Sequence, residues 1–153
     1  MGCAVRPAKP EDARAVGELA RKFAAYLRQL GDRADFQFDA KAYLRDGFGP
    51  NPAFSGLVAE THEQLVGYLL YHPGYDTDRA VRILHIVDLY VDEPFRRQRI
   101  ARALMEDVAR IGREIGAQEL FWSVYELNGV ARAFYERLGA KYTKDLKFMH
   151  WRA

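Results

Sequence analysis

The stretch HIVDLYVDEPFRRQRIARALM, residues 85–105, decides the fold of this chain. Its first half is rich in β-branched, aliphatic and aromatic side chains, and it predicts a strand that ends at Val91. Pro94 then breaks the run, as proline does between regular elements. From Arg96 onward, apolar residues recur at steps of three and four, which predicts a helix over about 97–115.

The start of this helix is suited to binding an anion. A helix leaves about four N–H groups unpaired at its first turn, and the helix dipole makes that end positive. Four arginines add charge there: Arg96, Arg97, Arg99 and Arg102. The turn could therefore hold a polyanion such as a pyrophosphate. From the residues alone, an ordinary strand–helix unit with a solvated basic turn is an equal alternative.

The rest of the chain predicts an α+β fold, an α/β sandwich around a mixed sheet. Helices are expected over about 10–30, 38–48, 97–115 and 128–138. Strands are expected over 5–7, 54–59, 65–71, 82–91, 119–124 and 142–150. Residues 61–64 are short enough for a hairpin turn, and residues 72–78 form a longer connection. Glycines 31, 116 and 139 are expected to end helices.

Composition predicts one globular domain over residues 1–153 and argues against several functions. The chain carries 23 basic and 21 acidic residues, a net charge of +2, which is too balanced to indicate nucleic-acid binding by itself. The four histidines are scattered and form no metal-binding motif, so no metal is expected. Without an apolar run of about 20 residues or a signal-peptide core, we expect a cytoplasmic protein that does not contact membranes. The single cysteine cannot form an internal disulfide.

Residues 96–101, RRQRIA, resemble the pyrophosphate loop of the GNAT superfamily of N-acetyltransferases, written [QR]-x-x-G-x-[GA]. Arg96 opens the pattern and Ala101 closes it, whereas Arg99 stands where the family usually has glycine. A side chain there could crowd the pyrophosphate or could point outward and add charge.

A second stretch, NGVARAFYERLGA at residues 128–140, predicts a helix that Asn128 caps. From the residues alone, Tyr135 could simply be a half-buried aromatic with a solvated hydroxyl. The stretch also resembles the second signature of the same superfamily, N-x-x-A-x-x-[FLY]-Y-x-x-x-G-[AF]. The two signatures occur in the expected order with a predicted strand between them.

The resemblance narrows to the spermidine/spermine and thialysine N-acetyltransferase branch over residues 46–52, 57–60, 66–68 and 88–91. It implies a mixed, mostly antiparallel central sheet flanked by helices. It further implies a homodimer that moves acetyl from acetyl-CoA directly to a primary amine of a small cationic molecule. Leu27 and Val87 stand where the polyamine enzymes carry acids, so a thialysine-like or amino-acid-like acceptor is as consistent as a polyamine.

The resemblance also implies roles for individual residues. Tyr135 would be the general acid for the departing thiolate, and Asp88 is a candidate base, with a structural anchor as the equal alternative. The cofactor would contact Leu89, Tyr90, Val91, Arg96, Arg97, Gln98, Arg99, Ile100, Ala101, Arg102, Asn128 and Ala131. The acceptor would contact Tyr26, Asp88 and Glu126, and Asp35 and Asp39 are further acids that could attract a cation.

Three other functions stay open at this point. One is N-acetylation of a protein or peptide, and a second is a non-catalytic CoA-binding module with the same fold. The third is nucleic-acid binding by the arginines, although Glu106, Asp107 and Glu114 on the same helix oppose it.

Overall fold

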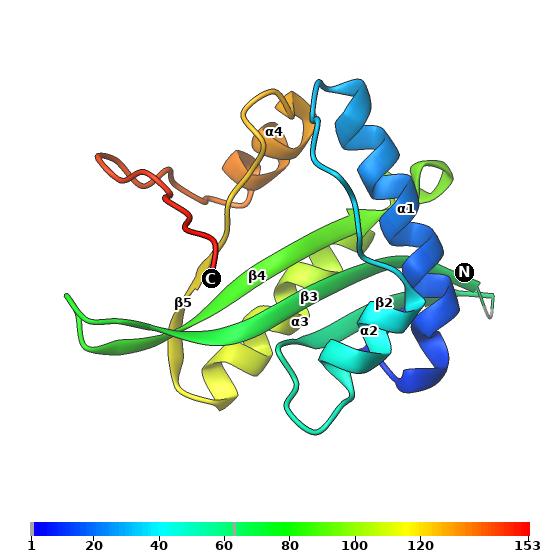
Figure 1. Ribbon diagram of the computed structural model, residues 1–153, viewed down its shortest axis with the longest axis horizontal. Coiled ribbons are helices and arrows are strands. Elements are labelled where there is room, and N and C mark those ends of the chain that lie inside the picture. Colours follow the sequence, from blue (N-terminus) through cyan, green and yellow to red (C-terminus); the bar gives the residue numbers. More distant parts are fainter. Residues whose placement is uncertain (1, 63) are drawn as a thin grey trace. The chain divides into compact units, whose positions relative to one another are not determined.

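The computed structural model describes residues 2–62 and 64–153 (Figure 1). The chain forms two compact units, Met1–Ser123 and Val124–Ala153. The first unit holds the sheet and three α-helices, and the second holds one helix, α4 (Gly129–Arg137). Among the described residues, every helix is too short or too polar to cross a lipid bilayer.

The first unit is built on a five-stranded sheet whose strands follow one another in chain order. The strands are β1 (Ala4–Pro7), β2 (Ser55–Thr61), β3 (Gln64–Asp76), β4 (Val81–Val91) and β5 (Ala117–Phe121). Strands β1 to β4 are antiparallel neighbours, whereas β4 and β5 are parallel. The predicted mixed, mostly antiparallel sheet is therefore confirmed.

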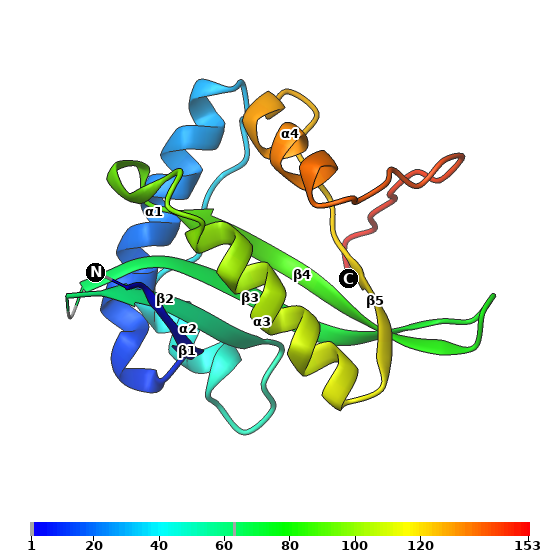
Figure 2. The ribbon, with the colours of Figure 1, turned by 180° about the vertical axis from the view of Figure 1, so that it is seen from behind.

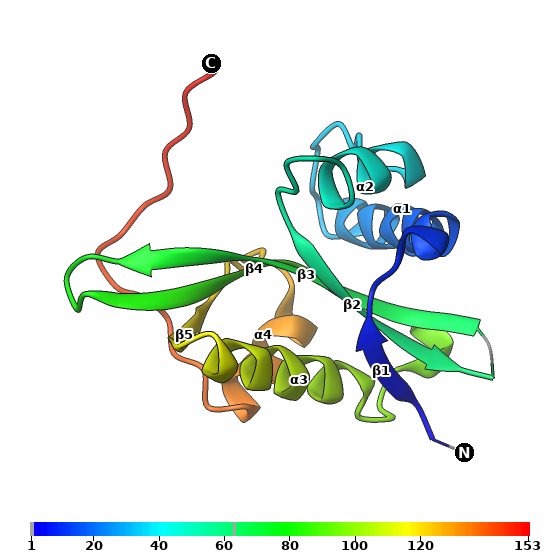
Figure 3. The same ribbon diagram turned by 90° about the horizontal axis from the view of Figure 1, so that it is seen from below.

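Helices cover both faces of this sheet (Figures 2 and 3). Helix α1 (Ala13–Gln29), which follows the short 3₁₀ helix η1 (Pro10–Asp12), lies with α2 (Ala40–Gly47) on one face. Helix α3 (Ile100–Glu114) lies on the other face, after the 3₁₀ helix η2 (Glu93–Phe95). The predicted α/β sandwich is confirmed.

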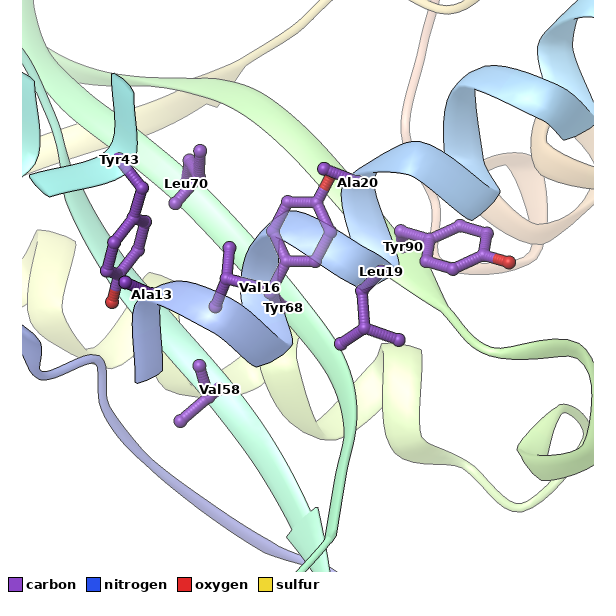
Figure 4. Packing of buried hydrophobic residues seen from close by; sticks show 9 residues of the cluster. All are labelled: Ala13, Val16, Leu19, Ala20, Tyr43, Val58, Tyr68, Leu70 and Tyr90. Carbon is purple, nitrogen blue, oxygen red and sulfur yellow. The ribbon is translucent and has the colours of Figure 1, made fainter. Parts of the chain in front are cut away.

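A buried cluster joins α1 and α2 to the sheet, as Figure 4 shows. Its members are Ala13, Val16, Leu19, Ala20, Tyr43, Val58, Tyr68, Leu70 and Tyr90. Full burial of one large apolar side chain stabilises a fold by roughly 1.5–3 kcal/mol, so the cluster fixes α1 against β3 and β4. The face that carries Tyr68, Leu70 and Tyr90 is thus the α1/α2 face of the sheet.

Several predicted boundaries are wrong in detail. Helix α3 begins at Ile100 rather than near Arg97, because the backbone at 97 and 99 is left-handed. Strand β3 continues through most of the predicted 72–78 connection to Asp76, because β4 pairs with it as far as Val81. The predicted turn at 61–64 does join β2 and β3, and its residue Glu63 lies outside the described residues.

The predicted strand over 142–150 is wrong. Residues 140–153 form neither helix nor strand, and α4 is the one regular element that the described part of the second unit contains. A strand needs a neighbour for its N–H and C=O groups, and this unit offers none. The large apolar side chains within 142–150 are exposed, up to 95% for Met149.

Candidate acyl-transfer site

Strand β4 loses one of its two neighbours halfway along its length. Its parallel pairing with β5 runs from Arg82 to the pair His85↔Phe121 and ends there. Its antiparallel pairing with β3 continues to Val91. Val87 has no partner on β3, since Leu70 pairs with Asp88 and Tyr71 with Ile86, so it forms a β-bulge at the same point. Within the described residues, the second half of β4, residues 86–91, is a sheet edge.

The alternation of backbone groups determines which residues face this open edge. In an antiparallel pair, hydrogen-bonded positions alternate with positions whose N–H and C=O point away from the partner. The Asp92 N–H donates to the Val66 carbonyl at 2.8 Å, which makes that pair hydrogen-bonded. Counting back along the register, Tyr90 and Asp88 also face β3, whereas Val91 and Leu89 face the open edge.

A side chain supports this assignment. The Arg96 Nε donates to the Val91 carbonyl at 3.0 Å from the side away from β3. The N–H and C=O of Leu89 and the N–H of Val91 are therefore the groups that an extended ligand could pair with at this edge.

The turn after β4 has the backbone shape of an anion-binding loop. Arg97 and Arg99 both have φ of 62°, and helix α3 begins at the next residue, Ile100. The first intrahelical bond runs from the Ala103 N–H to the Arg99 carbonyl, so the N–H groups of residues 100–102 precede any helical acceptor. Left-handed residues followed by a helix start concentrate N–H groups in one concavity, which suits phosphate.

The four arginines of this turn do not share one role. The Arg96 guanidinium carbon lies 5.0 Å from the ring centre of Tyr26 and 5.5 Å from that of Tyr90, which fastens the turn to α1 and β4. Arg102 pairs with Glu106 one helical turn away. Arg97 and Arg99 are exposed, as is Gln98 between them. Arg96 is thus primarily a structural residue, a role that the sequence analysis did not assign to it.

Asp88 combines partial burial with a weak hydrogen-bond partner. The Tyr68 hydroxyl donates to its carboxylate at 3.2 Å, and Tyr68 itself is 0% exposed. Burial disfavours the charged carboxylate more than this hydrogen bond favours it, so the pKa of Asp88 rises to about 6. Such a carboxylate can bind a cation and exchange a proton near neutral pH.

Asp88 lines a cavity of about 130 Å³ between α1, the segment after it and β4. The other lining residues are Phe23, Ala24, Leu27, Arg28, Asp32, Ala34 and Phe36. None of these seven was predicted as a site residue. Phe23 and Leu27 are four residues apart on α1, as core residues of a helix also are, and no sequence signal separates core from cavity wall.

The predicted acceptor residues thus have different surroundings. Asp88 lies in the cavity wall, whereas Tyr26 lies against Arg96. Asp39 caps α2 by accepting from the Ala42 N–H at 2.8 Å, and Asp35 is exposed and accepts from Gln37.

The second unit carries the other predicted site residues, Glu126, Asn128, Ala131 and Tyr135. The Asn128 side chain accepts from the Ala131 N–H at 3.2 Å, so the predicted cap of α4 is confirmed. Tyr135 is partly buried, with its ring centre 5.3 Å from that of Phe134.

The segment after α4 is tied back to the helix by polar contacts. The Tyr142 hydroxyl accepts from Arg132 Nε at 2.9 Å and donates to the Glu136 carboxylate at 2.8 Å. Arg132 also donates to the Glu126 carbonyl at 3.1 Å. The roles predicted for Tyr135, Asn128 and Ala131 remain predictions. Throughout the described ranges, no group of three or more His, Cys, Asp or Glu side chains is arranged to hold a metal ion.

Comparison with known proteins gives the class of the molecule. Residues 18–140 match the acetyltransferase (GNAT) family model. The chain is 30% identical over 154 residues to the thialysine N-epsilon-acetyltransferase of Bos taurus, covering 95% of this chain and 88% of that protein. It is 31% identical over 81 residues to the L-ornithine N5-acetyltransferase of Arabidopsis thaliana, covering 53% of this chain and 36% of that protein.

Among solved structures, an integron cassette protein of V. cholerae has the same fold. It superposes with a TM-score of 0.81 at 21% identity, covering 100% of this chain and 94% of that one. Together with the sequence matches, the fold defines the class of the protein, which is an acyltransferase. The chain belongs to the acetyltransferase (GNAT) family, and its relatives include thialysine N-epsilon-acetyltransferases. The family predicted from the two signatures is confirmed.

Arg99→Gly is predicted to stabilise the protein. A left-handed conformation costs a non-glycine residue roughly 1–2 kcal/mol, and glycine removes this cost. Glycine also makes the unfolded chain more flexible, which offsets about 0.5–1 kcal/mol of the gain in stability. We therefore expect the free energy of unfolding in urea to rise by about 0.5–1 kcal/mol. Arg102→Gly, three residues on in helical conformation, is the matched control and should lower it by about 1 kcal/mol. A loss of stability in both variants would contradict the strain at Arg99.

Proposed function

We propose that the protein transfers the acetyl group of acetyl-CoA to the terminal amine of a small diamino acid. The observation that carries the proposal is the adjacency of Asp88 and Leu89 on β4. One residue puts a carboxylate in the wall of a cavity, and the next presents its backbone N–H at the open edge. An ammonium bound by the first and a thioester oxygen bound by the second would be neighbours, as acyl transfer to an amine requires.

The last residues of β4 and the turn that follows them would bind different parts of acetyl-CoA, the cosubstrate that the GNAT family generally uses. The pyrophosphate would accept from the N–H groups of residues 98–102, with Arg97 and Arg99 adding positive charge. The pantetheine arm carries amides, so it could pair with Leu89 and Val91 as an added strand does. Asn128 and Ala131 would contact the cofactor near its thiol end.

The cavity supports an acceptor with one terminal amine, an apolar chain and a carboxylate. Its volume of about 130 Å³ is below the roughly 300–1,000 Å³ of sites that enclose a whole drug-sized ligand, so it suits one end of a substrate. Asp88 would pair with the terminal ammonium, while Phe23 and Leu27 would contact the methylenes. Arg28 could pair with a carboxylate, and the same guanidinium would repel the second cation of a polyamine.

The relatives are consistent with this acceptor class. Thialysine and ornithine, in the names of two related enzymes, are both diamino acids with a terminal primary amine. The remaining acid in the cavity wall, Asp32, could pair with the α-ammonium. Glu126 and Tyr26 were also predicted as acceptor contacts, and neither is among the lining residues of this cavity.

The chemistry would be direct transfer. The neutral amine attacks the thioester carbonyl, a C–N bond forms, and the oxyanion accepts from the Leu89 N–H, a contact of a kind that contributes ~100-fold or more. The C–S bond then breaks and Tyr135 donates its proton to the sulfur. We propose residues 1–153 as one catalytic domain, the homodimer that the resemblance implies, and the cytoplasmic location expected from composition.

The direct test is thiol release from acetyl-CoA with a panel of amines. Ornithine, thialysine and lysine should react faster than cadaverine, which has the terminal amine without the carboxylate, and faster than spermidine. Thiol release with a peptide but with none of the free amines would indicate a protein substrate instead of a diamino acid. No release with any amine, together with tight CoA binding, would contradict the proposed enzyme and favour a non-catalytic module.

Asp88→Asn is predicted to raise the KM for the amine about 10- to 100-fold, since a charge-assisted hydrogen bond is worth roughly 1.5–3 kcal/mol. With a pKa of about 6, Asp88 is ionised above that pH, so kcat/KM of the natural protein should fall as pH drops below 6. In Asp88→Asn, the KM for the amine should lack the rise that protonation of the carboxylate causes below pH 6. Asp78→Asn, in the exposed β3–β4 turn, is the control. An unchanged KM in Asp88→Asn would remove the carboxylate from amine binding.

Tyr135→Phe is predicted to lower kcat about 100-fold or more with little change in the affinity for acetyl-CoA. The substitution removes only the hydroxyl that would protonate the departing thiolate. Steady-state kinetics and calorimetry measure the two quantities separately. Tyr125→Phe, in the same unit, is a matched control and should keep its turnover. If Tyr135→Phe turns over as fast as the natural protein, Tyr135 is not the general acid.

A further inference from the structure

Two histidines lie side by side on neighbouring strands of the sheet, next to the proposed acceptor site. His72 on β3 pairs directly with His85 on β4, and their ring centres are 4.8 Å apart. Phe121 of β5 pairs with His85 from the other side, with ring centres 6.0 Å apart. His72 follows Leu70 by two residues, so both histidines stand on the α1/α2 face of the sheet.

The two rings differ in their hydrogen bonds. His72 Nδ1 lies 3.0 Å from the Pro73 carbonyl, to which it can donate. His85 Nδ1 is buried and has no hydrogen-bond partner. Leaving a buried polar atom unpaired costs roughly 1–3 kcal/mol, so its presence calls for a compensating role.

The bulge at Val87 brings Asp88 to the same face as His85. The pair Leu70↔Asp88 is followed on that face by His72↔His85, two residues further along β3. At about 3.3 Å per residue, the two pairs stand about 7 Å apart along the strands. That spacing is about two hydrogen-bond lengths, so one substrate nitrogen or one water molecule could bridge the two side chains.

The charge on this face favours a neutral imidazole that can accept a proton. Burial lowers the pKa of His85, and the neighbouring His72 lowers it further. The titratable groups around His85 on this face include His72, Tyr68, Asp88, Tyr90 and Glu119, and Glu119 is paired with Arg79. Two protonated rings 4.8 Å apart would repel, which also favours the neutral form of His85.

We infer that His85 is the base that removes a proton from the acceptor ammonium, directly or through one water, while Asp88 holds the ammonium in place. The ammonium has three protons. One goes to His85 and leaves to solvent, after which the C–N bond forms and the C–S bond then breaks. Tyr135 donates its hydroxyl proton to the sulfur and regains a proton from the attacking nitrogen. The third proton stays on the product amide.

The inference rests on the proposed function and extends it. The sequence had indicated Asp88 as the candidate base, and the inference gives that role to His85. It assigns the carboxylate to binding and the imidazole to proton transfer. The two assignments predict different kinetics: loss of Asp88 raises KM, and loss of His85 lowers kcat.

The test is His85→Gln in the full chain, assayed with acetyl-CoA and the amine that the panel identifies. At pH 7 we expect kcat to fall about 10- to 100-fold with KM nearly unchanged, since positioned acid–base catalysis contributes roughly 10²–10⁴-fold and water replaces part of it. The loss should shrink above pH 9, because an ordinary amine with a pKa near ~10 then supplies its own neutral form. His62→Gln, in the exposed β2–β3 turn, is the matched control and should keep the natural pH profile.

A second variant separates proton transfer from packing. His85→Ala should regain part of its kcat at pH 7 when imidazole is added to the assay, whereas His62→Ala should not respond. Loss of kcat that is equal at all pH values and is not rescued by imidazole would overturn the inference and leave His85 a packing residue. An unchanged kcat in His85→Gln would also overturn it. If the natural protein acetylates no amine, the proposed function fails before this comparison is made.

Discussion

The open edge of β4 is the constraint on which the rest of the site depends. A strand inside a sheet has a neighbour for every N–H and C=O, but β4 keeps β5 only as far as His85. The bulge at Val87 falls at this transition and reorients the strand, so that Asp88 faces α1 and Leu89 turns its backbone to the edge. Binding groups for an amine and for an extended amide chain therefore arise from consecutive residues of one rigid strand.

The elements around β4 hold this edge in position. The cluster between α1, α2 and the sheet fixes the wall of the cavity, and Tyr68 from that cluster also donates to Asp88. At the C-terminal end of β4, Arg96 contacts the rings of Tyr26 and Tyr90 and donates to the Val91 carbonyl. These contacts hold the turn that leads into α3 against the strand. Packing and polar contacts thus act on the same few backbone groups, as preorganised binding requires.

Short-range features of the site could be predicted from the sequence. The change from strand to helical periodicity across Pro94 gave β4 and α3. Asn128 predicted the cap of α4, and Gly31 and Gly116, which take positive φ, predicted two helix ends. These signals are local, because each depends on residues a few positions apart.

Long-range features could not be predicted in the same way. The cavity joins Phe23 and Leu27 of α1 to Phe36 and Asp88, and no local pattern reveals that they meet. The pairing of His72 with His85 depends on the register of β3 and β4, which the sequence left open. The strand predicted over 142–150 is absent, because a strand forms only where a neighbour exists.

Amide hydrogen exchange along β4 tests the central claim most directly. The account predicts that, without ligand, the Leu89 and Val91 amides exchange faster than those of Asp88 and Tyr90, which are bonded to β3. Acetyl-CoA should slow the exchange of Leu89 and Val91 and of residues 98–102. Equal protection of all four β4 amides in the free protein, or no change with acetyl-CoA, would contradict the account.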